Sequence, residues 1–284
     1  MKKQFQQSRQ PFQSEIQPLL NFYHAGQLPQ AEAAAKALLK TYPNTFILHN
    51  LLGIVLDGQS KVEEAIASYR KALLLQPAVP DLHFNLGIAL SNLGKLDEAA
   101  ASYRKAIALQ PGFFEAYGNL GTVLQKQGKL EEAIANYRKA LAINPDALGH
   151  FNLATALRNL GNLEEAIASF QNAIAANPNY ADAYSRLGEA LWHHGKLNEA
   201  VDSFNTALAI DPGNVSANYN LAIFLYDNGE LERAIPHFER SQFSDWRERV
   251  LYCLYKTEQY EAFKEKLKHA ISTDNVSPFL ATLS

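Results

Sequence analysis

The chain has 284 residues, of which 47% are hydrophobic and 19% are charged, and its formal net charge is −3. This composition supplies enough apolar side chains for a core, so it excludes a disordered protein, and the slight acidity argues against a nucleic-acid or membrane-surface binder. Cys253 is the only cysteine, which excludes an intrachain disulfide and a thiolate metal cluster.

The N-terminal segment, residues 1–11, is rich in glutamine and carries two lysines with no apolar stretch after them. A secretory signal needs such a stretch, and no run in the chain approaches the roughly 18 apolar residues that cross a bilayer. We therefore expect a polar tail at residues 1–11, followed by a soluble, cytoplasmic protein with no segment inserted in a membrane.

From residue 12 onward the sequence repeats itself. An alanine precedes each proline of the series, and an aromatic residue follows most of these alanines by four positions, as Tyr103 follows Ala99. A fixed period of this length is typical of stacked structural repeats. The prolines recur at spacings of 33 or 34 residues: Pro43, Pro77, Pro111, Pro145, Pro178 and Pro212.

Each period contains two windows of helical apolar spacing. A residue that favours the left-handed conformation should end the first helix, and the proline should end the second. Small residues in the middle of the first helix predict a close approach of the two helices, with the aromatic residue filling the gap toward the next pair. The helix-ending residues are Gly26, Ser60, Gly94, Gly128, Gly161, Gly195 and Gly229, and the small ones are Gly53, Gly87, Gly121, Ala154, Gly188 and Ala222.

This pattern resembles the tetratricopeptide repeat (TPR) family. The best match, residues 114–146, has Tyr117, Leu120, Gly121, Leu124, Gly128, Ala133, Tyr137, Ala140 and Pro145 at the family's positions. The resemblance implies an all-α fold, a right-handed α-solenoid (superhelix) of about seven TPR helical hairpins plus a degenerate C-terminal capping pair. The TPR array is expected over residues 12–243, with repeats at 12–45, 46–79, 80–113, 114–146, 147–180, 181–214 and 215–243.

Both ends of the array depart from the pattern. Ser14 is expected to cap the first helix, which would place Pro18 in its first turn. Residues 244–275 are expected to form the degenerate capping helix pair, because Leu251 and Phe263 replace the small residues there. Residues 276–284 form an apolar C-terminal tail, which either docks on the last helices or leads into a longer protein.

No catalytic or metal site is predicted. His193 and His194 are adjacent on a helix, so they point about 100° apart, and no third ligand stands at a suitable spacing. Acidic pairs such as Glu131 and Glu132 recur at the start of the second helices, where they complement the helix dipole. Phosphate-binding loops and nucleophile elbows are absent from the sequence. We expect no enzymatic activity, no cofactor and no nucleic-acid partner.

The sixth position of the repeat holds a row of polar side chains. In the TPR family the first helices line the concave inner face, so the resemblance places this row in the groove. An asparagine both donates and accepts hydrogen bonds, so the row can pair with the backbone of an extended peptide. In this it resembles the TPR region of O-GlcNAc transferases. The alternative is that these residues only cap neighbouring backbone groups. The row consists of Asn85, Asn119, Asn152, Arg186 and Asn220.

Aromatic residues share this face. Trp192 and Tyr226 stand at a position expected to face solvent, and we interpret them as ligand-binding residues. Phe84 and Phe151 are expected instead to pack against the adjacent repeat. A chaperone-type carboxylate clamp is not expected, because the fifth repeat positions hold no lysine. The candidate peptide-binding residues are therefore Asn85, Asn119, Asn152, Arg186, Asn220, Trp192, Tyr226 and Glu189.

We therefore expect a non-catalytic protein–protein interaction scaffold that binds a partner peptide or helix in the concave TPR groove, centred on Asn119, Asn152, Arg186 and Trp192. One alternative is a substrate-recruiting TPR module of a larger transferase whose catalytic domain lies beyond residue 284. Another is self-association through the exposed ends of the repeat array.

Overall fold

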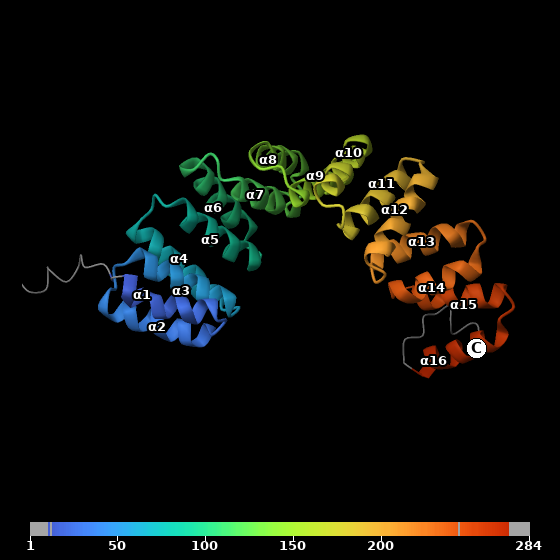
Figure 1. The fold of residues 1–284 in the computed structure, drawn as a ribbon, viewed down its shortest axis with the longest axis horizontal. Coiled ribbons are helices and arrows are strands. Elements are labelled where there is room, and N and C mark those ends of the chain that lie inside the picture. Colours follow the sequence, from blue (N-terminus) through green and yellow to red (C-terminus); the bar gives the residue numbers. More distant parts are fainter. Residues whose placement is uncertain (1–10, 12, 244, 273–284) are drawn as a thin grey trace, which may run out of the picture. The chain divides into compact units, whose positions relative to one another are not determined.

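A computed structural model describes residues 11, 13–243 and 245–272 of the chain. Every regular element in these residues is an α-helix, as the sequence predicts (Figure 1). Both predicted tails fall outside this description: residues 1–10 of the N-terminal tail and all of the C-terminal tail at 276–284. The chain divides into two compact units, residues 1–145 (unit 1) and 146–284 (unit 2).

The described residues of unit 1 form four helical hairpins in succession (Figure 1). The two helices of a hairpin pack on each other, and the second helix also packs on the first helix of the next hairpin. The pairs are α1 (Gln13–His24) with α2 (Leu28–Thr41), α3 (Phe46–Gly58) with α4 (Val62–Leu75), α5 (Pro80–Asn92) with α6 (Leu96–Leu109), and α7 (Phe114–Lys126) with α8 (Leu130–Ile143).

Unit 2 repeats this arrangement. Its first helices also touch one another, since α11 contacts both α9 and α13. Helix bounds do not fix where a repeat begins within a loop, so the repeat boundaries stay a prediction. The pairs are α9 (Ala147–Leu160) with α10 (Leu163–Ala176), α11 (Ala181–His193) with α12 (Leu197–Ile210), α13 (Val215–Asp227) with α14 (Leu231–Ser241), and α15 (Trp246–Lys256) with α16 (Tyr260–Ser272).

The turn inside a hairpin depends on one residue in the left-handed conformation. Gly94 has φ 77° at the end of α5, and the five other glycines predicted for this role also have positive φ. Ser60 takes the same conformation after α3, with φ 60°. A residue with a Cβ is strained there by about 1–2 kcal/mol. The prediction that these residues end the first helices is confirmed.

A close approach of ring and backbone joins the two helices of a hairpin. A Cβ added to Gly121 in α7 would lie 2.7 Å from the Tyr137 ring of α8, which is closer than real Cβ contacts allow. Gly53, Gly87 and Gly188 meet a ring in the same way. The ring therefore packs first within its own hairpin, whereas the sequence led us to expect it in the gap toward the next pair. Close packing at the small residues is confirmed.

The fourth repeat position holds a side chain that hydrogen-bonds to the preceding loop in several hairpins. His49 and His83 each bring ring nitrogen Nε2 within 2.9 Å of the carbonyl oxygen of the proline six residues earlier. Asn218 donates from Nδ2 to the Pro212 carbonyl oxygen at 3.0 Å. These side chains tie the start of a first helix to the loop before it.

The ends of the array differ partly from expectation. Helix α1 begins at Gln13, so Ser14 lies inside the helix and does not cap it, and Pro18 lies past the first turn. The expectation of a Ser14 cap was wrong because the helix starts earlier than the capping pattern suggested. Pro236 lies inside α14. In the last pair the buried Leu251 packs against Phe263 and Leu267.

Candidate peptide-binding surface

The first helices of unit 2 form one continuous surface. Helix α11 contacts α9 and α13, and side chains of α15 contact side chains of α13. We call the surface formed by α9, α11, α13 and α15 the first-helix face of unit 2. Six of the candidate residues lie in these helices and remain at least partly exposed at the face: Asn152, Arg186, Glu189, Trp192, Asn220 and Tyr226.

Glu189 lies at the centre of this face. Its Oε1 accepts hydrogen bonds from Arg186 Nη1 and Asn220 Nδ2, each at 3.0 Å, and its Oε2 pairs with Arg158. The Glu189 side chain is 14% exposed, compared with 21% for Arg158 and 37% for Arg186. One carboxylate thus links three consecutive first helices, and the two arginines leave one positive charge uncompensated within the cluster.

Arg158 was not among the binding residues predicted from the sequence, although its repeat position could have indicated it. It stands 34 residues before Trp192, which stands 34 residues before Tyr226, so all three occupy the same repeat position. Two members of this series were selected because they are aromatic. Selecting the residues at this repeat position regardless of their type would have added Arg158 to the candidate binding residues.

The asparagine row has partners within the protein. Asn85 donates from Nδ2 to Asn50 Oδ1 at 3.1 Å, which joins α5 to α3. Asn119 of α7 hydrogen-bonds the buried Tyr103 side chain of α6. In both cases the partner is a side chain of the preceding hairpin. Asn85 and Asn119 are therefore neither unpaired residues that wait for a peptide nor caps of backbone groups. Asn152 is half-buried and makes no side-chain hydrogen bond to another described residue.

The aromatic residues at the fifth repeat position pack between hairpins. The Phe84 ring centroid lies 4.7 Å from that of Phe113, which precedes the next first helix. Phe151 lies 5.1 Å from Tyr180 in the same arrangement, and Tyr219 stacks on Phe243 at 4.5 Å. Phe84 also packs against a buried cluster that includes Ala116 of α7, so its packing against the adjacent repeat is confirmed. Tyr180 is the last residue of the repeat that contains Phe151, so for Phe151 this packing stays a prediction.

Trp192 and Tyr226 are less open than expected. Both are half-buried, because neighbouring rings cover their edges. Trp192 meets Phe204 and Phe224 edge-on at 6.3 and 6.2 Å. Tyr226 lies 5.6 Å from Tyr252 of the next hairpin. Each ring keeps only part of its surface for a ligand.

Tyr226 also lines a pocket at the C-terminal end of the face. The pocket lies between the end of α13 and one side of α15, and we call it the tyrosine pocket. None of its α15 residues was selected from the sequence, because the repeat pattern is degenerate there. Its lining residues are Tyr226, Asp245, Glu248, Arg249 and Tyr252.

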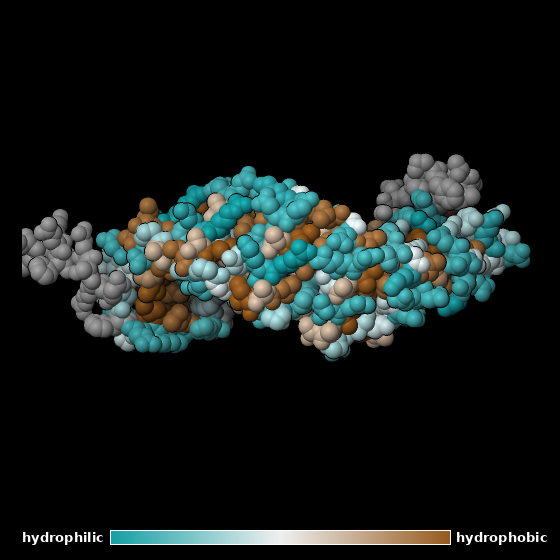
Figure 2. Space-filling view, turned by 90° about the horizontal axis from the view of Figure 1, so that it is seen from above, coloured by the Kyte–Doolittle hydropathy of each residue, from teal (hydrophilic) through white to brown (hydrophobic). Residues whose placement is uncertain are grey.

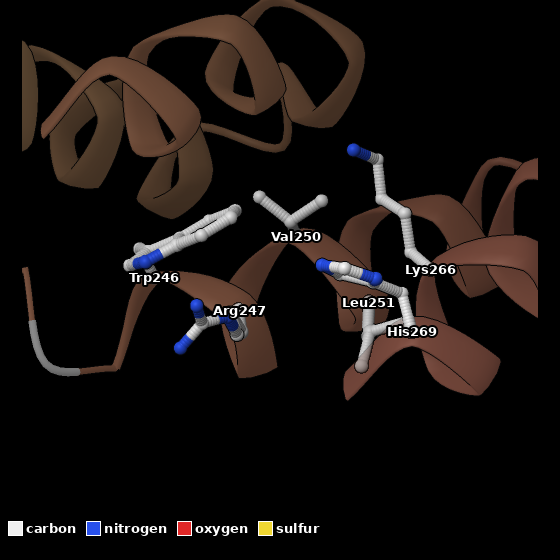
Figure 3. A pocket seen from close by; sticks show the side chains of 6 residues that line it. All are labelled: Trp246, Arg247, Val250, Leu251, Lys266 and His269. Carbon is white, nitrogen blue, oxygen red and sulfur yellow. The ribbon is translucent and has the colours of Figure 1, made fainter. Parts of the chain in front are cut away.

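Other hollows lie away from this face. Between α15 and α16, Trp246 stands on one side of a pocket and Lys266 and His269 on the other (Figure 3). In unit 1 an open hollow runs over α2, α3 and α4, where Leu39 and the exposed Leu74 contribute apolar surface. Figure 2 shows hydrophobic residues gathered around a hollow near the N-terminal end.

The Cys253 thiol near the face is not an activated nucleophile. Burial raises the pKa of the Cys253 thiol to about 11, so the thiol stays protonated and unreactive at neutral pH. Burial likewise raises the pKa of Tyr219 and Tyr226. In the part of the chain that the structure describes, no helix is long and apolar enough to span a membrane.

Comparison with protein families supports the assignment of the fold. Models described as tetratricopeptide repeats match residues 58–94, 91–128, 114–146, 151–215 and 191–242. The chain belongs to the tetratricopeptide-repeat family. No curated protein matches this TPR chain in sequence.

Solved structures of other proteins share the fold. YrrB, described as a TPR protein with an unusual peptide-binding site, is 24% identical, with a TM-score of 0.56 over 65% of this chain and 95% of YrrB. PilF of Pseudomonas aeruginosa is 20% identical, with a TM-score of 0.62 over 72% of this chain and 93% of PilF. A TPR protein from Parabacteroides merdae is 20% identical, with a TM-score of 0.66 over 85% and 98% of the two chains.

Proposed function

We propose that this TPR protein is a non-catalytic interaction scaffold, and that the first-helix face of unit 2 binds an extended or helical segment of a partner protein. The observation that carries the proposal is the sharing of Glu189 by Arg158 and Arg186. Repeat proteins of stacked hairpins commonly bind ligands along the face lined by their first helices.

The arginines retain capacity for a ligand. A guanidinium carries five N–H donors, and the contacts to Glu189 use only Nη1 of Arg158 and of Arg186. Neither guanidinium has another partner among the residues described. The free donors and the uncompensated positive charge suit a carboxylate or a backbone carbonyl of a bound segment.

The asparagines supply a second kind of contact. Asn152 of α9 offers a donor and an acceptor to a peptide backbone, beside the arginines of the same face. Asn85 and Asn119 would serve a ligand on unit 1 by sharing or exchanging their present partners, Asn50 and Tyr103. An amide row of this kind resembles that of O-GlcNAc transferases, and YrrB is a TPR protein for which a peptide-binding site is described.

A peptide selection tests this function. Twelve-residue peptides selected from a random display library on the full chain are titrated against the wild type, Arg186→Gln and Arg240→Gln. We expect affinities on the order of micromolar for the wild type, about −8 kcal/mol. Arg186→Gln should weaken binding at least tenfold, while Glu189 keeps Arg158 and Asn220 as partners, so the fold persists.

Arg240→Gln is the matched control, because Arg240 is exposed on the second helix α14 of the same unit. It should leave the affinity unchanged, and circular dichroism should show equal helix content in all three proteins. Peptides that bind wild type and Arg186→Gln equally well would remove the first-helix face as the binding surface.

A further inference from the structure

The tyrosine pocket combines aromatic walls with carboxylates. Asp245, Glu248, Arg249 and Tyr252 follow a spacing of three and four residues, which places them on one side of α15. Tyr226 closes the pocket from the end of α13, with its ring centroid 5.6 Å from that of Tyr252 and the two planes inclined by 50°. Tyr252 is 36% exposed, so its ring is open to a ligand.

The one cation of the pocket is already compensated. Arg249 Nε lies 2.5 Å from Asp245 Oδ2, and the guanidinium lies over the Tyr226 and Phe238 rings, 5.7 Å from each centroid. An anionic ligand would have to separate this ion pair. Arg249 therefore acts as part of the pocket wall.

Glu248 leaves the pocket with a negative charge. It is half-buried and forms no ion pair with any residue that the structure describes. With Asp245 and Arg249 paired, the lining has two carboxylates and one guanidinium. A carboxylate or phosphate would be repelled here, and a cation attracted.

Asp245 adds an acceptor without a donor. Its Oδ1 is buried and has no hydrogen-bond partner among the described residues, whereas Oδ2 is held by Arg249 and lies 3.5 Å from the Tyr219 hydroxyl. A buried carboxylate oxygen is costly to leave unpaired. A ligand that donates hydrogen bonds into the pocket would satisfy it.

We infer that the tyrosine pocket holds a lysine or arginine side chain of the bound segment. Tyrosine faces attract cations, carboxylates pair with them, and both side chains donate several hydrogen bonds. This inference rests on the proposed function and makes it more specific. The partner segment would carry an acidic group for Arg158 and Arg186 and a basic side chain for the tyrosine pocket.

The test uses the selected twelve-residue peptides on the full chain. Peptides that depend on Arg186 should carry a recurrent lysine or arginine, and replacing it with norleucine or glutamine should weaken binding at least tenfold. Glu248→Gln and Tyr252→Leu should each weaken binding of the unmodified peptide at least threefold. Replacing the basic residue of the peptide should reduce affinity less for Glu248→Gln than for the wild type. A merely structural role of Glu248 would give the same reduction in both proteins.

Glu232→Gln is the control, because Glu232 is exposed on the second helix α14. It should change no affinity. Equal costs of the peptide replacement in wild type and Glu248→Gln, or Arg186-dependent peptides without a recurrent basic residue, would overturn the inference and leave the proposed function standing. Loss of the Arg186 dependence itself would instead mark failure of the proposed function.

Discussion

At the residue scale, four hairpins pack an aromatic ring of the second helix against a glycine of the first helix. Tyr137 is 1% exposed and lies against Gly121, and the same relation joins Phe204 to Gly188. Burial of a large ring stabilises the pair by about 1.5–3 kcal/mol. The glycine weakens its helix by roughly 0.5–1 kcal/mol, so the ring contact outweighs the cost.

Two glycines of α7 separate these effects. Gly121→Ala should destabilise unit 1 by about 1–3 kcal/mol, because the new Cβ would meet the Tyr137 ring at 2.7 Å. Gly118→Ala should stabilise it by about 0.5–1 kcal/mol, because nothing lies within 4 Å of the new Cβ and alanine favours the helix. Thermal unfolding followed by circular dichroism measures both. Shifts of equal sign would contradict the packing described.

The left-handed serine gives a second prediction at this scale. Ser60→Gly should raise the free energy of unfolding by about 1 kcal/mol, because glycine takes φ 60° without Cβ strain. The matched change Gly94→Ser should lower it by a similar amount, since Gly94 has φ 77° at the equivalent turn. Urea unfolding compares the two. A loss of stability in Ser60→Gly would show that the serine side chain contributes more than its strain costs.

At the element scale, polar side chains fix how one hairpin follows the next. Glu189 joins α9, α11 and α13, and Asn85 joins α5 to α3. The half-buried His237 of α14 and the buried Asn218 of α13 join the helices of one hairpin, with Nδ1 and Oδ1 2.9 Å apart. Asn218 is fully buried and its Nδ2 donates to the carbonyl oxygens of Pro212 and Asn214, so its Oδ1 accepts a hydrogen bond from Nδ1 of His237.

Unit 2 should lose stability in mild acid. Burial first, and then Arg240 and Arg233, hold the pKa of His237 below its usual 6.5. As pH falls below 6.5, His237 binds a proton in the unfolded chain before it does so in the folded chain, so the free energy of unfolding falls. The stabilisation is complete above about pH 6.5 and is lost toward and below the folded pKa.

Tryptophan fluorescence can follow this effect, because the chain's two tryptophans, Trp192 and Trp246, both lie in unit 2. The urea midpoint of the wild type should be lower at pH 5.5 than at pH 7.5, and His237→Gln should reduce the difference. Some difference should remain, because burial also lowers the pKa of His150. An unchanged difference in His237→Gln would exclude His237 as its source.

At the scale of the whole molecule, the sequence predicted the parts that repeat and missed the parts that do not. Glycines and prolines at fixed spacing specify hairpins because backbone conformation is local. Phe224, which meets Trp192, and Tyr252, which meets Tyr226, belong to the next hairpin, so this part of the half-burial could not be predicted from one repeat. Tyr252 was missed because α15 has lost the repeat pattern that would place it on the face, as Leu251 in a small-residue position shows.

Binding on the first-helix face of unit 2 is the central claim, and photo-crosslinking from defined positions tests it most directly. A photoreactive amino acid replaces Leu148, an exposed residue of α9, or Gln171, an exposed residue of the second helix α10. With an Arg186-dependent selected peptide, we predict crosslinks from position 148 and none from position 171. Crosslinks from position 171 alone would contradict the account.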